Sequence, residues 1–98
     1  MKIEELEPNT KVINLIGQLQ KLDEITETPT GVKVQDGILK DSTGQVKIAL
    51  WAEQAGRFKE GDKIIMTTGW CKTFEDELQV SPGKFGKILR YTDPEVKN

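Results

Sequence analysis

The segment 45–51, QVKIALW, is the most informative stretch of this sequence for the fold. Successive side chains of a β-strand point to opposite faces, so the valine, isoleucine and leucine at its even positions share one face. This apolar face predicts a strand with one side buried in a core. Trp51 falls on the other side with Lys47, where a half-buried strand normally meets water. The position of this tryptophan therefore needs a reason.

The sequence on either side of 45–51 predicts further short strands separated by turn signals. Strands are expected at 12–22, 32–39, 45–51 and 62–70, with a last, interrupted strand made of 78–81 and 84–91. Residues 52–58 are expected to form a short helical connection between the third and fourth strands, with Phe58 packed inward. Five short strands of this kind predict an all-β domain.

The first predicted strand contains a glycine, Gly17. Ile13, Leu15 and Leu19 have matching parity, which predicts that all three lie on the buried face. A glycine inside a strand often marks a bulge or a bend. We therefore expect this strand to curve near Gly17 so that it serves two sheets.

The composition limits both the size and the chemistry of the protein. Its 98 residues are 36% apolar and 31% charged, with a net charge of −2, which fits one globular domain. We expect this domain to cover residues 1–92, followed by a short tail at 93–98. No apolar run approaches the roughly 20 residues needed to cross a bilayer, and the acidic N-terminus is unlike a signal peptide, so a cytoplasmic protein is expected.

The absence of histidine and the presence of a single cysteine exclude most enzymatic chemistry. An internal disulfide is excluded, and a structural zinc site lacks ligands. No base is available to activate a serine or cysteine nucleophile. We expect a protein that is not an enzyme and that needs no cofactor and no metal.

Three features that resemble sites have simpler explanations. DSTG at 41–44 lacks the spacing of an aspartic-protease triplet, and it predicts a hairpin turn with Gly44 in the left-handed conformation. Cys71 is expected to be a small buried or half-buried residue. The acidic run 75–77 is expected to be a solvated tip, because three consecutive residues at a turn point in different directions.

The aromatic residues give the clearest indication of a binding site. Trp51, Trp70 and Phe74 lie near lysines at strand ends. Trp70 and Phe74 share a face only if the strand continues through residue 73, and a bulge at Gly69 would be needed to turn them outward. Exposed flat aromatic rings interleaved with Lys33, Lys47 and Lys72 predict base stacking with contacts to the nucleic-acid backbone.

Three motifs resemble those of a known family. They are D-x-T-G-x-V-K-x-x-L-W at 41–51, the KEGD turn at 59–62 and W-x-x-x-F at 70–74. With these motifs the chain resembles the single OB-fold single-stranded DNA-binding proteins of archaea, whose domain is similar to those of eukaryotic replication protein A. The resemblance implies a five-stranded Greek-key OB-fold barrel that binds nucleic acid across its second and third strands and two flanking loops.

The resemblance also implies a function and a set of contact residues. Its stacking aromatics fall on Trp51, Trp70 and Phe74. We predict that the backbone contacts come from lysines, namely Lys33, Lys47, Lys72, Lys84 and Lys87. The expected function is binding of single-stranded DNA by a monomer, with little sequence preference, in replication, recombination and repair, where replication or repair proteins are the expected partners.

Two alternatives to this function remain open. An RNA-binding OB module would use the same aromatic residues. A protein-interaction OB subunit would dock a partner on the same face. No membrane and no small-molecule substrate are expected in any of the three cases.

Overall fold

Seven strands and two short 3-10 turns make up the computed structural model, which describes residues 1–82 and 86–91. The strands are β1 (Thr10–Leu22), β2 (Thr26–Glu27), β3 (Lys33–Asp41), β4 (Gly44–Trp51), β5 (Lys63–Phe74), β6 (Glu77–Ser81) and β7 (Lys87–Arg90), and the turns are η1 (Ile3–Glu5) and η2 (Ala52–Gln54). Lys84, the predicted domain boundary after residue 92 and the predicted tail 93–98 lie outside the described residues.

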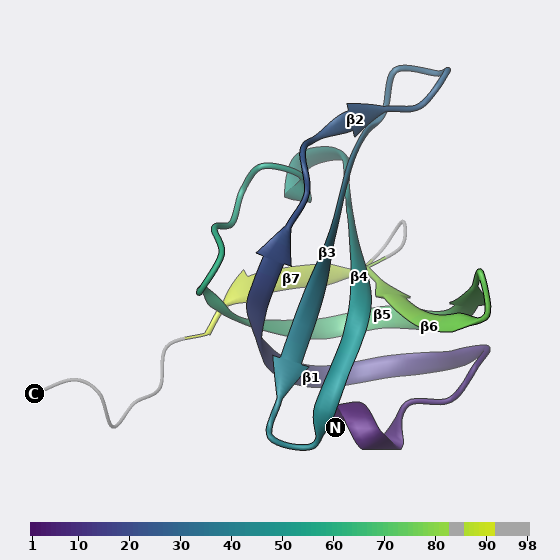
Figure 1. The fold of residues 1–98 in the computed structure, drawn as a ribbon, viewed down its shortest axis with the longest axis vertical. Helices are drawn as coiled ribbons and strands as arrows, with labels where there is room; N and C mark the ends of the chain where they lie inside the picture. Colours follow the sequence, from purple (N-terminus) through teal and green to yellow (C-terminus); the bar gives the residue numbers. More distant parts are fainter. Residues whose placement is uncertain (83–85, 92–98) are drawn as a thin grey trace, which may run out of the picture.

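The strands form one sheet that closes on itself (Figure 1). Their order is β1-β3-β4-β6-β5-β7, and β1 also pairs with β5, which closes the barrel. β6 and β7 are the two parts of the interrupted last strand, so the predicted five-stranded all-β barrel is confirmed. The connection after β4 contains only the single 3-10 turn η2. Within the described part of the chain, no helix is long and apolar enough to cross a membrane.

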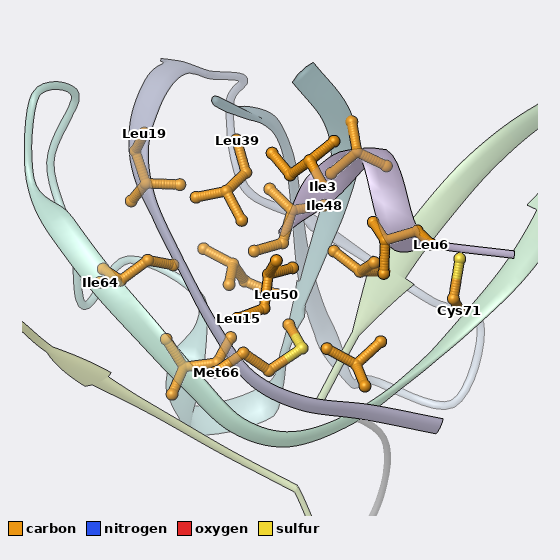
Figure 2. Close-up of a cluster of buried hydrophobic side chains, with 14 of the residues drawn as sticks. Ile3, Leu6, Leu15, Leu19, Leu39, Ile48, Leu50, Ile64, Met66 and Cys71 are labelled. Atoms are coloured by element: carbon orange, nitrogen blue, oxygen red, sulfur yellow. The ribbon is translucent and has the colours of Figure 1, made fainter. Parts of the chain in front are cut away.

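The core fills the barrel from end to end (Figure 2). Its fully buried side chains include Leu15, Leu19, Leu39, Ile48, Leu50, Ile64, Met66 and Ile88. Each buried side chain of this size contributes about 1.5–3 kcal/mol of transfer free energy. Phe58 is buried as predicted. The N-terminal turn η1 adds two core residues that the sequence analysis missed, Ile3 and Leu6.

The prediction that Ile13 lies on the buried face of β1 is wrong. Its side chain is 50% exposed, whereas Val12 and Leu15 are buried. Asn14, between them, has a left-handed φ of 53°. This conformation, which asparagine tolerates better than most residues, reverses the alternation of the strand.

The predicted bend at Gly17 is confirmed. β1 pairs with β5 from Thr10 to Gln18 and with β3 from Gln18 to Leu22, so the strand leaves one neighbour for the other at this point. A Cβ atom at Gly17 would lie 2.8 Å from the Leu39 Cγ atom. The absence of a side chain allows the two parts of the barrel to approach each other closely.

The turn between β3 and β4 is held by a carboxylate, not by a left-handed glycine. Gly44 has no positive φ, so that prediction is wrong. Asp41 accepts hydrogen bonds from the Thr43 amide at 2.7 Å and the Ile3 amide at 2.8 Å. Burial raises the pKa of Asp41, but bonds from the Thr43 hydroxyl and from three backbone amides lower it below its usual value. The stability that this group contributes is therefore present at neutral pH and is lost as the pH falls through the lowered pKa.

Candidate nucleic-acid interface

The three aromatic residues singled out by the sequence are all exposed. The exposed fractions are 39% for Trp51, 45% for Trp70 and 48% for Phe74. Trp51 ends β4, whose inward positions are filled by core residues. Trp70 and Phe74 lie in the second half of β5, which continues to Phe74 as the shared-face interpretation required.

A bulge turns the second half of β5 outward, but it lies at Thr67 and not at Gly69. The pairing of β5 with β7 shifts between Met66 and Thr68. Before this point Ile64 and Met66 point inward, and after it Gly69 and Cys71 do. Cys71 is fully buried, as expected, and burial raises the pKa of its thiol.

A groove of about 530 Å³ lies beside Trp51 and is called the Trp51 groove here. It is lined by Trp51, Ala52, Glu53, Gln54, Lys72, Ser81, Pro82 and Gly86. Trp70 is paired with Ser81 across β5 and β6, so its side chain stands at the margin of this groove. Ala52 has a left-handed φ of 55°, which is unfavourable for alanine. The chain therefore turns sharply right after Trp51.

A second groove of about 250 Å³ lies beside Phe74 and is called the Phe74 groove here. It is lined by Lys21, Asp23, Asp36, Gly37, Ile38, Lys47, Phe74, Glu75 and Gln79. These residues come from β1, β3, β4, β6 and the ends of two loops. The chain segments that form this groove are therefore far apart in the sequence.

The two grooves meet along a row of paired residues on the outer surface of the barrel. Lys47 on β4 is paired with Gln79 on β6, and Gln79 is paired with Lys72 on β5. Gln79 lines the Phe74 groove and Lys72 lines the Trp51 groove. Together the two grooves and this row form one continuous surface, called the groove face below.

The lysines of the groove face differ in their surroundings. Lys47 Nζ lies 3.8 Å from a carboxylate oxygen of Glu77, and Lys21 Nζ lies 3.8 Å from one of Asp23. Among residues 1–82 and 86–91, Lys72 makes no ion pair. Lys72 is therefore the lysine of this face that is freest to meet a phosphate.

The hairpin between β5 and β6 places acidic residues at the end of the groove face. Phe74 is paired with Glu77, so the turn has only two central residues. Glu75 and Asp76 both have left-handed φ angles, 52° and 67°. This is the backbone of a type I′ turn, which favours Asn-Gly. Both residues are exposed, in agreement with the predicted solvated tip.

The remaining predicted lysines lie away from the two grooves. Lys33 is paired with Glu27 and lines a separate depression that shares Ala52 and Glu53 with the Trp51 groove. Lys87 is paired with Thr68 on the outside of β5 and β7 and lines neither groove. Its contact with nucleic acid stays a prediction.

Two features of the groove face were missed by the sequence analysis. Lys21 and Gln79 line the Phe74 groove, and only the pairing of strands brings them there. Gln35 is 8% exposed, and its side-chain amide bonds the Asp23 carbonyl and the Gly56 amide, each at 2.9 Å. A glutamine at an inward position of a strand was the available signal. It ties the two loops on either side of Trp51 to the barrel.

Comparison with known proteins places this architecture. No protein-family model matches the chain. It is 31% identical over 95 residues to the single-stranded DNA binding protein Ssb of Saccharolobus solfataricus, covering 94% of this chain and 64% of that protein. The chain thus spans slightly less than two thirds of that relative's length.

Two solved structures show the same barrel. The second OB-fold domain of replication protein A from Methanococcus maripaludis is 25% identical with a TM-score of 0.65, over 94% of this chain and 98% of that one. An OB domain from Thermoplasma acidophilum has a TM-score of 0.75 at 19% identity, over 95% of this chain and 87% of that one.

The class of the protein follows from the barrel and these neighbours: it is an OB-fold domain. Within this class, the chain resembles an archaeal single-stranded DNA-binding protein and the OB domains of replication protein A. The resemblance drawn from its sequence motifs is therefore confirmed.

Proposed function

We propose that this domain binds single-stranded DNA along the groove face, with little sequence preference. The observation that carries the proposal is the exposure of Trp51, Trp70 and Phe74 along one continuous surface. Stacking on aromatic side chains is sequence-tolerant, because every base has a π face, and it contributes about 1–3 kcal/mol per base.

The backbone contacts in this proposal come mainly from lysines of the groove face. Lys72 lies between Trp70 and Phe74 on β5, where it can meet the phosphates between stacked bases. Lys47 and Lys33 are further contacts, and Lys47 must first give up its pairing with Glu77. Binding would then depend on stacking more than on charge, which fits a net charge of −2.

The relatives support this proposal. Ssb is named for binding single-stranded DNA, and the Methanococcus domain belongs to replication protein A. We extend the proposal to a role in protecting single strands during replication, recombination and repair, as a binding module without catalysis.

Titration with oligo-dT while following tryptophan fluorescence tests the proposal. We expect quenching by the single strand and none by a duplex of the same length. A variant with Trp51, Trp70 and Phe74 all changed to Ala should lose about 3 kcal/mol or more of binding free energy, as followed by anisotropy of a labelled oligo-dT.

A matched control removes exposed apolar side chains elsewhere. Ile13→Ala with Leu89→Ala should bind oligo-dT like the parent protein, since neither side chain lines a groove. A triple variant that folds and binds as tightly as this control would refute the proposal. Tighter binding of a matched RNA oligomer would instead assign the face to RNA.

A further inference from the structure

A second surface, on the outside of β1, β5 and β7, differs in composition from the groove face. These three strands lie side by side, with β5 in the middle (Figure 1). Their sequences contain no aspartate and no glutamate. Three of their lysines, Lys11, Lys63 and Lys87, are exposed. We call this surface the β1–β5–β7 face.

The centre of the β1–β5–β7 face is aliphatic. Ile65 on β5 is paired with Ile16 on β1 and with Leu89 on β7, which makes an apolar row across all three strands. Leu89 is 43% exposed, and Ile13, in a neighbouring row, is 50% exposed. Exposed apolar patches with a polar rim are typical of interaction sites.

The lysines form the rim of this aliphatic centre. Lys87 is paired with Thr68 one row above, and Lys63 follows one row below, where its Nζ lies 5.7 Å from the centre of the Tyr91 ring. Lys11 is paired with Trp70 at the edge that borders the groove face. In the described ranges 1–82 and 86–91, none of these three lysines forms an ion pair.

We propose that the β1–β5–β7 face is a docking surface for an acidic segment of a partner protein that also carries apolar side chains. The lysine rim complements carboxylates, and the row of Ile16, Ile65 and Leu89 complements aliphatic side chains. A nucleic acid fits this face less well, because its bases stack on aromatic rings and the centre here is aliphatic.

This inference does not rest on the proposed DNA binding. The two surfaces use different residues, and only Trp70 stands at their border, so DNA and a peptide can be bound at the same time. The domain would then hold a single strand on one side and recruit a partner protein on the other.

Binding of a model peptide tests the inference. The probe is a fluorescein-labelled peptide with repeated Glu-Glu-Leu-Leu segments, compared with one in which every Glu is Gln. We expect saturable binding of the acidic peptide, seen by anisotropy with and without saturating oligo-dT. Amide signals of β1, β5 and β7 should shift in NMR spectra.

Two exposed substitutions should separate this surface from the rest of the protein. Lys63→Glu together with Leu89→Ser should weaken peptide binding about tenfold or more, because charge attraction and apolar contact are both lost. The matched control Lys59→Glu, an exposed lysine outside this face, should change peptide binding by less than about twofold. Oligo-dT binding should be the same in all three proteins.

Three results would overturn the inference. The first is no peptide binding up to millimolar concentration. The second is displacement of the peptide by oligo-dT with shifts on β3, β4 and β6, which would place the peptide in the grooves. The third is a shift of the Lys63 and Leu89 amides by oligo-dT alone, which would assign this face to nucleic acid.

Discussion

The Trp51 groove and the Phe74 groove each offer an exposed aromatic side chain, but their charges differ. The Trp51 groove is lined by one lysine, Lys72, and one carboxylate, Glu53. The Phe74 groove is lined by two lysines and three carboxylates, and both of its lysines lie 3.8 Å from a carboxylate. A strand bound along both grooves would therefore meet two different environments.

The difference separates the two sources of binding energy. Stacking depends on an exposed ring and is available at both ends of the groove face. Attraction of phosphates depends on unpaired lysines and is concentrated at the Trp51 end. We therefore expect the Trp51 end to anchor the strand and the Phe74 end to hold it more weakly.

Removing the two aromatic side chains one at a time tests this expectation most directly. Trp51→Ala should cost about 2–3 kcal/mol of oligo-dT binding and Phe74→Ala about 1 kcal/mol, because the phenyl ring is smaller and its groove is acidic. Anisotropy with labelled oligo-dT at fixed salt measures both. A larger loss for Phe74→Ala would reverse the proposed order of the two ends.

Gly37→Ala should damage the Phe74 groove through the backbone. Gly37 lines this groove, and an added Cβ atom would collide with the carbonyl oxygen of Lys21. We expect a loss of about 1–3 kcal/mol in the free energy of unfolding, measured with urea. Gly44→Ala is the control, since its Cβ atom would meet nothing closer than 3.7 Å. Equal stability of the two variants would contradict the prediction.

Replacing the acidic turn should make the two ends more alike. Glu75→Asn with Asp76→Gly gives the residues that a type I′ turn favours and removes two negative charges. We expect a gain of about 1 kcal/mol in the free energy of unfolding, because two strained left-handed residues are relieved, with tighter DNA binding as well. An unchanged melting temperature would show that the turn is not strained.

Freeing Lys47 should have the smallest effect of the four. Glu77→Gln removes the carboxylate beside Lys47, and we expect oligo-dT to bind about twofold more tightly. The plot of log affinity against log salt should steepen by up to about 0.7, the value for one further phosphate contact. Glu24→Gln, an exposed residue outside both grooves, controls for the change in net charge. A parallel salt dependence in both variants would exclude the contact.

Strand alternation predicted the candidate site where the strand was regular. β4 keeps its inward side chains in step up to Trp51, so the exposure of that residue followed from the sequence. In β1 the same rule misplaced Ile13, because the left-handed residue Asn14 is not visible in an apolar pattern. The bulge of β5 was anticipated at Gly69, but Thr67 has no sequence signal for it.

The electrostatics of the site could not be predicted from single segments. Lys47 was predicted as a free phosphate contact, but the parallel pairing of β4 with β6 brings Glu77 beside it. Likewise, η1 lies in an acidic N-terminal stretch that looked too polar to join the core, yet Ile3 is buried. Both outcomes depend on long-range contacts that local patterns do not contain.

The reversals in β1 and β5 have a consequence for engineering the barrel. The register of the two strands places Asn14 level with Thr67, since Ile13 pairs with Thr68 and Leu15 pairs with Met66. Without these two residues, each strand would alternate regularly along its whole length. Asn14 and Thr67 thus act as a matched pair of one-residue insertions. A chimera that exchanges one strand between OB domains must therefore carry both insertions or neither, because a single one would shift every later pair between the two strands.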